Sequence, residues 1–301
     1  MREINVHELA DEAKFNRFHA KVLAWCFVVI IIDGYDLAVA GAALPAIMKE
    51  MGVEAATAGF MASSALFGMM FGAIFLGALS DKIGRRWTIS LCVSLQRIHR
   101  GSGADQRSCH LQHRALHRGL GIGGVMPNIT AQMTEYAPKR IRSFLTTVMF
   151  SGYAIGGILA AVLGKQFIAQ FGWQIVFFAA GVPVLLIPFI LKSMPESLSF
   201  LVSRRDSAQL RQIAQSIDPG LKIGANDTFH PPRATNAGAG ATVAQLFQDG
   251  RGLSTVMFWV AFFTGLFMIY ALSTWLTKLM AMSGYSLGSA LSLSSHSMWV
   301  R

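Results

Sequence analysis

Residues 22–44 read VLAWCFVVIIIDGYDLAVAGAAL, an apolar run whose only charged residues are Asp33 and Asp36. A helix that crosses a bilayer needs about 20 mostly apolar residues, so this run predicts a spanning helix. Two acids at the middle of a span are costly unless they face a cavity or partners. A spacing of three residues places both carboxylates on one face of the helix. The run therefore predicts a membrane protein with polar chemistry inside the bilayer.

Similar apolar runs recur along the chain, and each is long enough to cross a bilayer. They are Ala58–Leu79, Phe144–Leu163, Trp173–Leu191 and Leu253–Met282. Two further runs are broken, since Trp87–Leu95 stops early and Gly119–Met133 is short. Only 14% of the residues are charged, against about a quarter in a soluble domain. The sequence therefore predicts an all-α membrane protein with six N-terminal spans and span seven, of which spans three and four are disrupted.

Basic residues gather in alternate connecting segments. They follow span two, precede span five and follow span six: Lys82, Arg85, Arg86, Lys139, Arg140, Arg142, Lys192, Arg204, Arg205 and Arg211. Because basic loops stay in the cytoplasm, this pattern explains most of the net charge of +10 without nucleic-acid binding. We expect a cytoplasmic N-terminal segment (1–21), a transmembrane bundle (22–192), a cytoplasmic linker loop (193–252) and the start of a second bundle (253–301).

One segment inside the bundle does not fit a span. Residues 96–118 read QRIHRGSGADQRSCHLQHRALHR and hold four of the eight histidines. Each charge at the bilayer centre costs about 2.5–3.5 kcal/mol, so this segment is aberrant where span three should end and span four begin. We interpret it as a compensated frameshift. The alternatives are a true insertion and a metal site formed by Cys109, His110, His113 and His117, and we predict no metal site.

Asp33 and Asp36 carry the strongest candidate chemistry. Inside a membrane they can take up and release a proton or contact a substrate. The alternative is that both acids hold neighbouring helices together through hydrogen bonds. Gly34 lies between them and would let a substrate or a neighbouring helix approach closely.

A second candidate feature follows span two, where residues 77–86 read GALSDKIGRR. Gly77 and Gly84 would permit a tight turn between helices. Asp81 can pair with an arginine or with a helix N-terminus, and Arg85 and Arg86 add positive charge. Such a cluster suits a gate that breaks and re-forms when helices move. The alternative is an ordinary basic loop that only sets the orientation.

At these two motifs the chain resembles the major facilitator superfamily. The run 77–86 matches the signature between spans two and three of that superfamily, and the run 33–36 (DGYD) resembles the hallmark of its aromatic acid/proton symporter family. Three further runs resemble that family: 119–127 (GLGIGGVMP), 135–138 (EYAP) and 195–197 (PES). The opening residues of the chain resemble those of its benzoate transporters. The resemblance implies two six-helix bundles around a central site, alternating access and proton symport.

Carried over by position, the resemblance assigns Asp33, Asp36 and Glu135 to substrate and proton coupling. It assigns Gly77, Asp81, Gly84, Arg85 and Arg86 to the gate. Glu135 can also be read as an ordinary loop residue near the end of span four. The family expects an arginine four residues before Gly119, where this chain has Ala115 between Arg114 and Arg118. That departure affects recognition of an anion, because a buried guanidinium is a natural partner of a carboxylate.

The resemblance implies proton-coupled import of a small aromatic carboxylate, of the benzoate or hydroxybenzoate type, across the bacterial inner membrane. The proton would be the coupling ion, and no cofactor is expected. The alternatives are transport of another organic acid or a sugar, and an inactive product. Residues 292–301 lose the apolar pattern, and we expect a truncated chain that transports poorly. The sequence contains no P-loop, HExxH or GxSxG motif, so we predict no enzymatic activity. It leaves the oligomeric state open.

Overall fold

A computed structural model of the chain describes residues 3–52, 54–96, 108–221, 228–230, 247–248 and 250–286. The predictions made for residues 97–107 and 292–301 lie outside this part of the chain. The helices are α1 (Val6–Glu12), α2 (Arg17–Met51), α3 (Ala55–Ile83), α4 (Arg85–Leu95), α5 (Ser108–Tyr136), α6 (Arg142–Phe171), α7 (Gln174–Ala179), α8 (Ile187–Ser193), α9 (Leu198–Ser203), α10 (Ser207–Ile217) and α11 (Gly252–Met282), with a 3₁₀ helix η1 (Val182–Leu186). Strands β1 (Glu3–Asn5) and β2 (Thr228–His230) pair in parallel.

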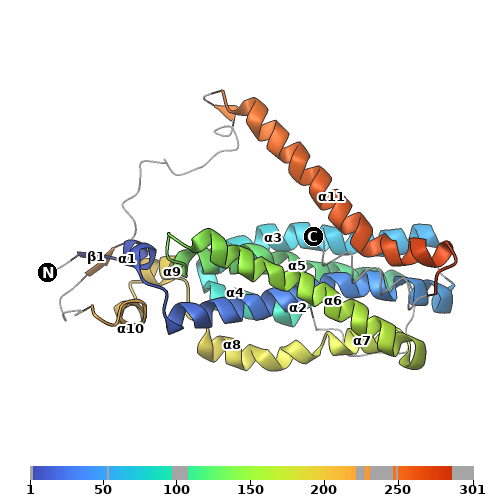
Figure 1. Cartoon of the computed structure of the whole chain (residues 1–301), viewed down its shortest axis with the longest axis horizontal. Coiled ribbons are helices and arrows are strands. Elements are labelled where there is room, and N and C mark those ends of the chain that lie inside the picture. Colours follow the sequence, from blue (N-terminus) through green and yellow to red (C-terminus); the bar gives the residue numbers. More distant parts are fainter. Residues whose placement is uncertain are drawn as a thin grey trace.

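The long helices lie side by side in an elongated bundle (Figure 1). Among the described residues, five helical segments are long and apolar enough to cross a membrane: Arg17–Glu50, Ala56–Ile83, Arg142–Phe171, Gln174–Ser193 and Gly252–Leu272. These contain or closely match the five complete spans that the apolar runs predict. Many of their large apolar side chains face outward, including Phe75 and Phe189, each 62% exposed. An apolar outer surface suits a protein whose surroundings are lipid.

Helices α4 and α5 stand where the sequence predicts the disrupted spans three and four. Helix α4 has 11 residues, too few to cross a bilayer at 1.5 Å per residue. Helix α5 is 29 residues long, but its first part is the basic run that begins at Ser108. Of the four candidate metal ligands in that region, the structure describes the side chains of His113 and His117, whose ring centroids are 4.3 Å apart.

Span six is not the single helix that its apolar run predicts. The segment divides into α7, the 3₁₀ helix η1 and α8. Pro183 lies near the start of η1 and Pro188 near the start of α8. Proline has no N–H group and clashes with the preceding turn, so it begins helices more readily than it continues them. The two prolines therefore explain why a run of uniform hydropathy is broken.

Two helix pairs pack most closely, α2 with α6 and α3 with α5. Glycines line both contacts: a Cβ atom added to Gly34, Gly156, Gly68 or Gly123 would lie closer than 3.0 Å to backbone atoms of the partner helix. Small residues let helix backbones approach in this way inside a membrane. Gly34 therefore serves a helix contact, which is one of the two roles that its position allowed.

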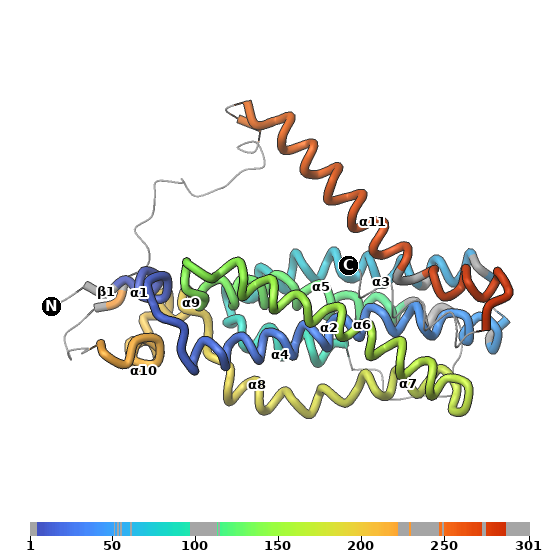
Figure 2. Tube along the Cα trace, viewed as in Figure 1, coloured from blue at the N-terminus to red at the C-terminus, as the bar shows by residue number. Residues whose placement is uncertain are grey.

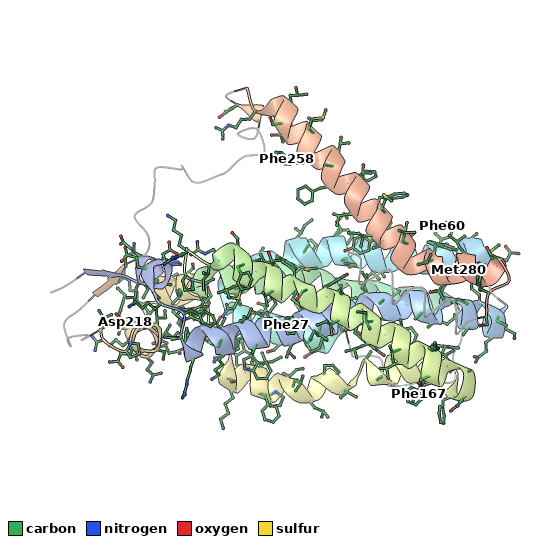
Figure 3. The ribbon with its side chains drawn as sticks, in the orientation of Figure 1. Phe27, Phe60, Phe167, Asp218, Phe258 and Met280 are labelled. Atoms are coloured by element: carbon green, nitrogen blue, oxygen red, sulfur yellow. The ribbon has the colours of Figure 1, made fainter. Side chains whose placement is uncertain are left out.

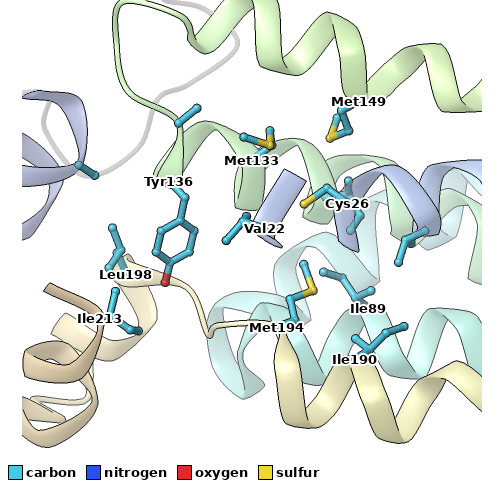
Figure 4. Packing of buried hydrophobic residues seen from close by; sticks show 14 of the residues in the cluster. Val22, Cys26, Ile89, Met133, Tyr136, Met149, Ile190, Met194, Leu198 and Ile213 are labelled. Atoms are coloured by element: carbon cyan, nitrogen blue, oxygen red, sulfur yellow. The ribbon is translucent and has the colours of Figure 1, made fainter. Parts of the chain in front are cut away.

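A small cap covers one end of the bundle, built from α1, α9, α10 and the β1–β2 pair (Figures 1 and 2). The predicted linker 193–252 thus contains helices and a short strand among its described residues. A buried cluster joins the cap to the bundle, with Val22 from α2, Ile89 from α4, Tyr136 from α5 and Leu198 from α9 (Figure 4). Helix α11 packs mainly against α2; the end that carries Met280 lies near the bundle, whereas Phe258 stands clear of it (Figure 3).

Candidate functional site

The two predicted acids lie at the middle of α2 and are withdrawn from the surface. Asp33 and Asp36 are each 1% exposed. Gly34, between them, touches the backbone of Tyr153 in α6. The hydroxyl of Tyr35 donates a hydrogen bond to the carbonyl oxygen of Val176 in α7, at 2.8 Å. The segment that carries both acids is therefore held firmly between α6 and α7.

Arg118 of α5 reaches Asp36, although the sequence did not single it out. One terminal nitrogen, Nη2, donates a hydrogen bond to the backbone oxygen of Asp36. The same nitrogen lies 3.8 Å from the carboxylate atom Oδ1 of Asp36. The guanidinium also lies over the ring of Phe177, 5.0 Å from the ring centroid, which is the geometry of a cation–π interaction. A buried acid, a cation and an aromatic ring thus meet at mid-span.

This contact bears on the arginine that the family resemblance led us to expect at position 115. Ala115 occupies that position, so we expected weakened anion recognition. Arg118 stands one turn further along α5 and supplies a guanidinium to the same region. Its side chain is only 15% exposed. The site therefore contains a guanidinium, the group that suits a carboxylate, but it comes from position 118 and not from position 115.

The residues that the sequence predicts to form a gate lie at the capped end of the bundle, around the turn between α3 and α4. Gly84 has a φ of +94°, a left-handed conformation that favours glycine. A Cβ atom there would also collide with the carboxylate of Glu196. That carboxylate accepts a hydrogen bond from the backbone N–H of Arg86 at 3.1 Å, and the Arg86 guanidinium lies 3.9 Å from it. Glu196, from the PES run, is therefore part of this cluster.

Glu135 belongs to the same cluster. Its carboxylate lies 2.5 Å from Nη1 of Arg85. It accepts hydrogen bonds from the N–H of Leu198 at 3.0 Å and from the hydroxyls of Ser197 and Ser199 at 2.9 and 2.7 Å. Glu135 is 17 residues beyond Arg118 on α5, about 25 Å along the helix axis. The structure thus places Glu135 beside Arg85 of the predicted gate, and its predicted role in substrate or proton coupling stays a prediction.

Two members of the gating motif stand apart. Gly77 lies inside α3 with open space around its Cα atom, so the expectation that it helps to form the turn is wrong. The turn is formed at Gly84 alone, because α3 continues to Ile83. Asp81 is exposed, and in the part of the chain that the structure describes it takes part in no ion pair. Arg85 and Arg86 pair with glutamates from α5 and the PES run instead.

A groove lies between α3 and α11. Its volume is about 560 Å³, and its lining includes Ser63, Leu66, Phe263, Phe267, Tyr270 and Trp275. This volume lies in the range of small-molecule sites.

Comparison with known proteins identifies the family. The family of sugar (and other) transporters matches residues 22–294. The chain belongs to this family of the major facilitator superfamily. Its members and the relatives below are transporters, which confirms the prediction that this transporter chain is not an enzyme.

Three curated relatives are aromatic acid transporters. The chain is 41% identical to the benzoate transport protein of Acinetobacter baylyi, over 96% of this chain and 64% of that protein. It is 32% identical to the 4-hydroxybenzoate transporter PcaK of Pseudomonas aeruginosa, over 96% and 65%. It is 30% identical to the gallate transporter of Pseudomonas putida, over 96% and 65%. The chain thus spans just under two thirds of the length of these relatives.

Solved structures confirm the fold. The partially occluded, inward-open form of the xylose transporter XylE from Escherichia coli matches 93% of this chain and 67% of its own, with a TM-score of 0.67 and 18% identity. At that identity the likeness concerns the fold alone. The family and the apolar helices together establish a membrane protein, as predicted.

Proposed function

We propose that this transporter imports a small aromatic carboxylate, of the benzoate or hydroxybenzoate type, together with a proton across the bacterial inner membrane. The relatives named as benzoate, 4-hydroxybenzoate and gallate transporters support the substrate class. The observation that carries the proposal is the contact of Asp36 with Arg118 in the middle of the bundle. It joins a group that can bind a proton to a group that can bind a carboxylate.

The contact suggests how proton and substrate are coupled. While Asp36 is ionised, its carboxylate competes with the substrate carboxylate for the guanidinium of Arg118. When Asp36 takes up a proton, its negative charge is lost and the positive charge of Arg118 becomes available to the anion. Each ligand then favours the binding of the other, which is the thermodynamic condition for coupled transport. Asp33, equally buried and on the same helix, is the second candidate proton carrier.

In this proposal the two helical bundles move relative to each other around this site, and that movement gives alternating access. In this proposal the N-terminal segment (1–21) and the linker (193–252) lie in the cytoplasm. Residues 22–192 form the first bundle, and residues from 253 onward begin the second. The gate at the cytoplasmic end is then formed by a cluster of ion pairs: Arg85, Arg86, Glu135 and Glu196. The basic residues of this end support that orientation.

A binding experiment on the 301-residue chain in lipid nanodiscs tests the site. We expect labelled benzoate to bind more tightly as the pH falls from 7.5 to about 5.5, where benzoate itself is still an anion. Asp36→Asn, which mimics the protonated acid, keeps benzoate binding but removes most of its dependence on pH. Arg118→Ala loses binding by about tenfold or more, since hydrogen bonds to charged groups contribute about 1.5–3 kcal/mol. Equilibrium dialysis measures the bound fraction.

The transport step is tested in vesicles that carry an imposed proton gradient. We expect the uptake of labelled benzoate to be slow, to be abolished by a protonophore, and to be inhibited by 4-hydroxybenzoate but not by xylose. Inhibition by xylose or by a non-aromatic acid alone would assign the chain to another substrate class. Benzoate uptake that persists after the gradient collapses would contradict proton coupling.

A further inference from the structure

A basic surface at the capped end of the bundle lies outside the proposed transport site. Arg17 and Lys21 of α2 and Lys192 of α8 are exposed. In the part of the chain that the structure describes, none of these three cations takes part in an ion pair. The ion pairs of this end are formed by other arginines, namely Arg85, Arg86 and Arg142.

A hydrogen bond between α2 and α8 lies close to the two lysines. The indole N–H of Trp25 in α2 donates to the hydroxyl of Ser193 in α8, at 3.0 Å. Lys21 lies one helical turn before Trp25, and Lys192 directly precedes Ser193. The two lysines therefore flank the same contact between α2 and α8. We call Arg17, Lys21, Trp25, Lys192 and Ser193 the basic seam.

The apolar surface beside the seam is the kind that faces lipid. Leu185 is 71% exposed and Phe189 is 62% exposed. They are four residues apart, so both lie on the face of the helical segment that leads to Lys192 and Ser193. Along this face the surface changes from large apolar side chains to cations within two helical turns. Trp25 stands at the change, and tryptophan is enriched at membrane–water interfaces.

We propose that the basic seam binds the headgroup of an anionic phospholipid, with an acyl chain lying over Leu185 and Phe189. The cations supply the charge that a phosphate requires, and lysine stems can extend along apolar surface with their ammonium groups in the headgroup layer. Basic pockets between spanning helices bind anionic headgroups by this combination. The proposal requires only that the chain spans a membrane, so it does not depend on the transport reaction.

Quenching of Trp25 fluorescence measures occupancy at the seam. The protein is reconstituted with phospholipids brominated on the acyl chain, and Trp25→Phe identifies the part of the signal that comes from Trp25. We expect brominated phosphatidylglycerol to quench Trp25 at a lower mole fraction than brominated phosphatidylcholine. Removing each lysine weakens the preference about fivefold, because a cation near the surface contributes about that factor to the attraction of anionic lipid.

The variants separate specific binding from general attraction to a charged membrane. Lys21→Gln/Lys192→Gln should lose the preference, and Lys21→Arg/Lys192→Arg should keep it. Lys49→Gln/Lys165→Gln removes the same charge from the far ends of α2 and α6 and should leave the preference intact. Equal quenching by both lipids in the unaltered chain, or a preference that survives Lys21→Gln/Lys192→Gln, would overturn the proposal.

Two measurements on the unaltered chain need no substitution at the seam. The preference should fall when the salt concentration is raised from 0.1 M to about 1 M, where the Debye length drops from about 10 to 3 Å. Inorganic phosphate at millimolar concentration should not displace the lipid, because it has no acyl chain. A preference that ignores salt, or one that phosphate abolishes, would exclude a phospholipid as the occupant.

Discussion

At the scale of the residue, Arg118 is the group on which the proposed chemistry depends. It is nearly buried, it contacts Asp36 and it lies over Phe177. A buried charge is costly unless several groups stabilise it. The aromatic ring supplies part of that stabilisation, and the hydrogen bond from Tyr35 to Val176 holds the neighbouring turn of α7 in place.

Phe177→Leu should weaken benzoate binding by about two- to fivefold, the equivalent of the 0.5–1 kcal/mol of a cation–π contact. Phe177→Trp, which keeps an aromatic face, should retain binding close to that of the unaltered chain. Equilibrium dialysis with labelled benzoate gives the dissociation constants. Phe178→Leu is the matched control, because Phe178 is the next residue and is 58% exposed. Equal effects of Phe177→Leu and Phe178→Leu would show that the ring does not position Arg118.

At the scale of the element, close contact between α2 and α6 depends on glycine. Gly156→Ala should lower thermal stability, because the added Cβ atom would lie closer than 3.0 Å to the backbone of α2. Overpacking of this kind costs about 1–3 kcal/mol. Gly265→Ala in α11 is the control, since a Cβ atom there meets nothing within 4 Å and alanine favours the helix by about 1 kcal/mol. The melting temperatures of the two variants are measured in the same detergent. If Gly156→Ala were as stable as Gly265→Ala, the close contact between α2 and α6 would be refuted.

The elements also show what a sequence can predict. The complete spans follow from apolar runs, because length and hydropathy are local properties of the chain. The division of span six was missed because its hydropathy is uniform, although Pro183 and Pro188 were the available signal. The positions of Asp33 and Asp36 on one buried face followed from their spacing alone.

The partners of the site residues could not be predicted in the same way. Asp36 and Arg118 are 82 residues apart, and Glu135 meets Ser197 across 62 residues. Such contacts depend on how the helices pack, which periodicity does not encode. Arg118 is the last residue of the segment 96–118, which we interpreted as aberrant. A guanidinium close to a span that contains a buried acid was the signal that could have identified it.

At the scale of the whole molecule, the capped end joins the turn between α3 and α4 to helices α1 and α9. Glu135 is central to this connection, because its carboxylate pairs with Arg85 and accepts the N–H of Leu198 at the start of α9. Helix α1 is tied to the same end, since Arg142 pairs with Asp11 and the N–H of Lys139 donates to the Asp11 backbone oxygen at 3.0 Å. These contacts connect the turn directly to the cap.

Glu135→Ala should release the cap from the bundle without unfolding the spans. Loss of hydrogen bonds to a charged group costs about 1.5–3 kcal/mol, so amide exchange in α9 and α10 should accelerate by about tenfold or more. Hydrogen–deuterium exchange with peptide resolution measures this, and exchange in α2 and α6 should stay unchanged. Glu54→Ala is the control, because Glu54 is an exposed residue whose side chain caps no helix. If α9 exchanged equally slowly in both variants, the Glu135 contacts would not hold the cap. Acceleration confined to α9 and α10 would show that the gating cluster joins two parts that are otherwise able to move separately.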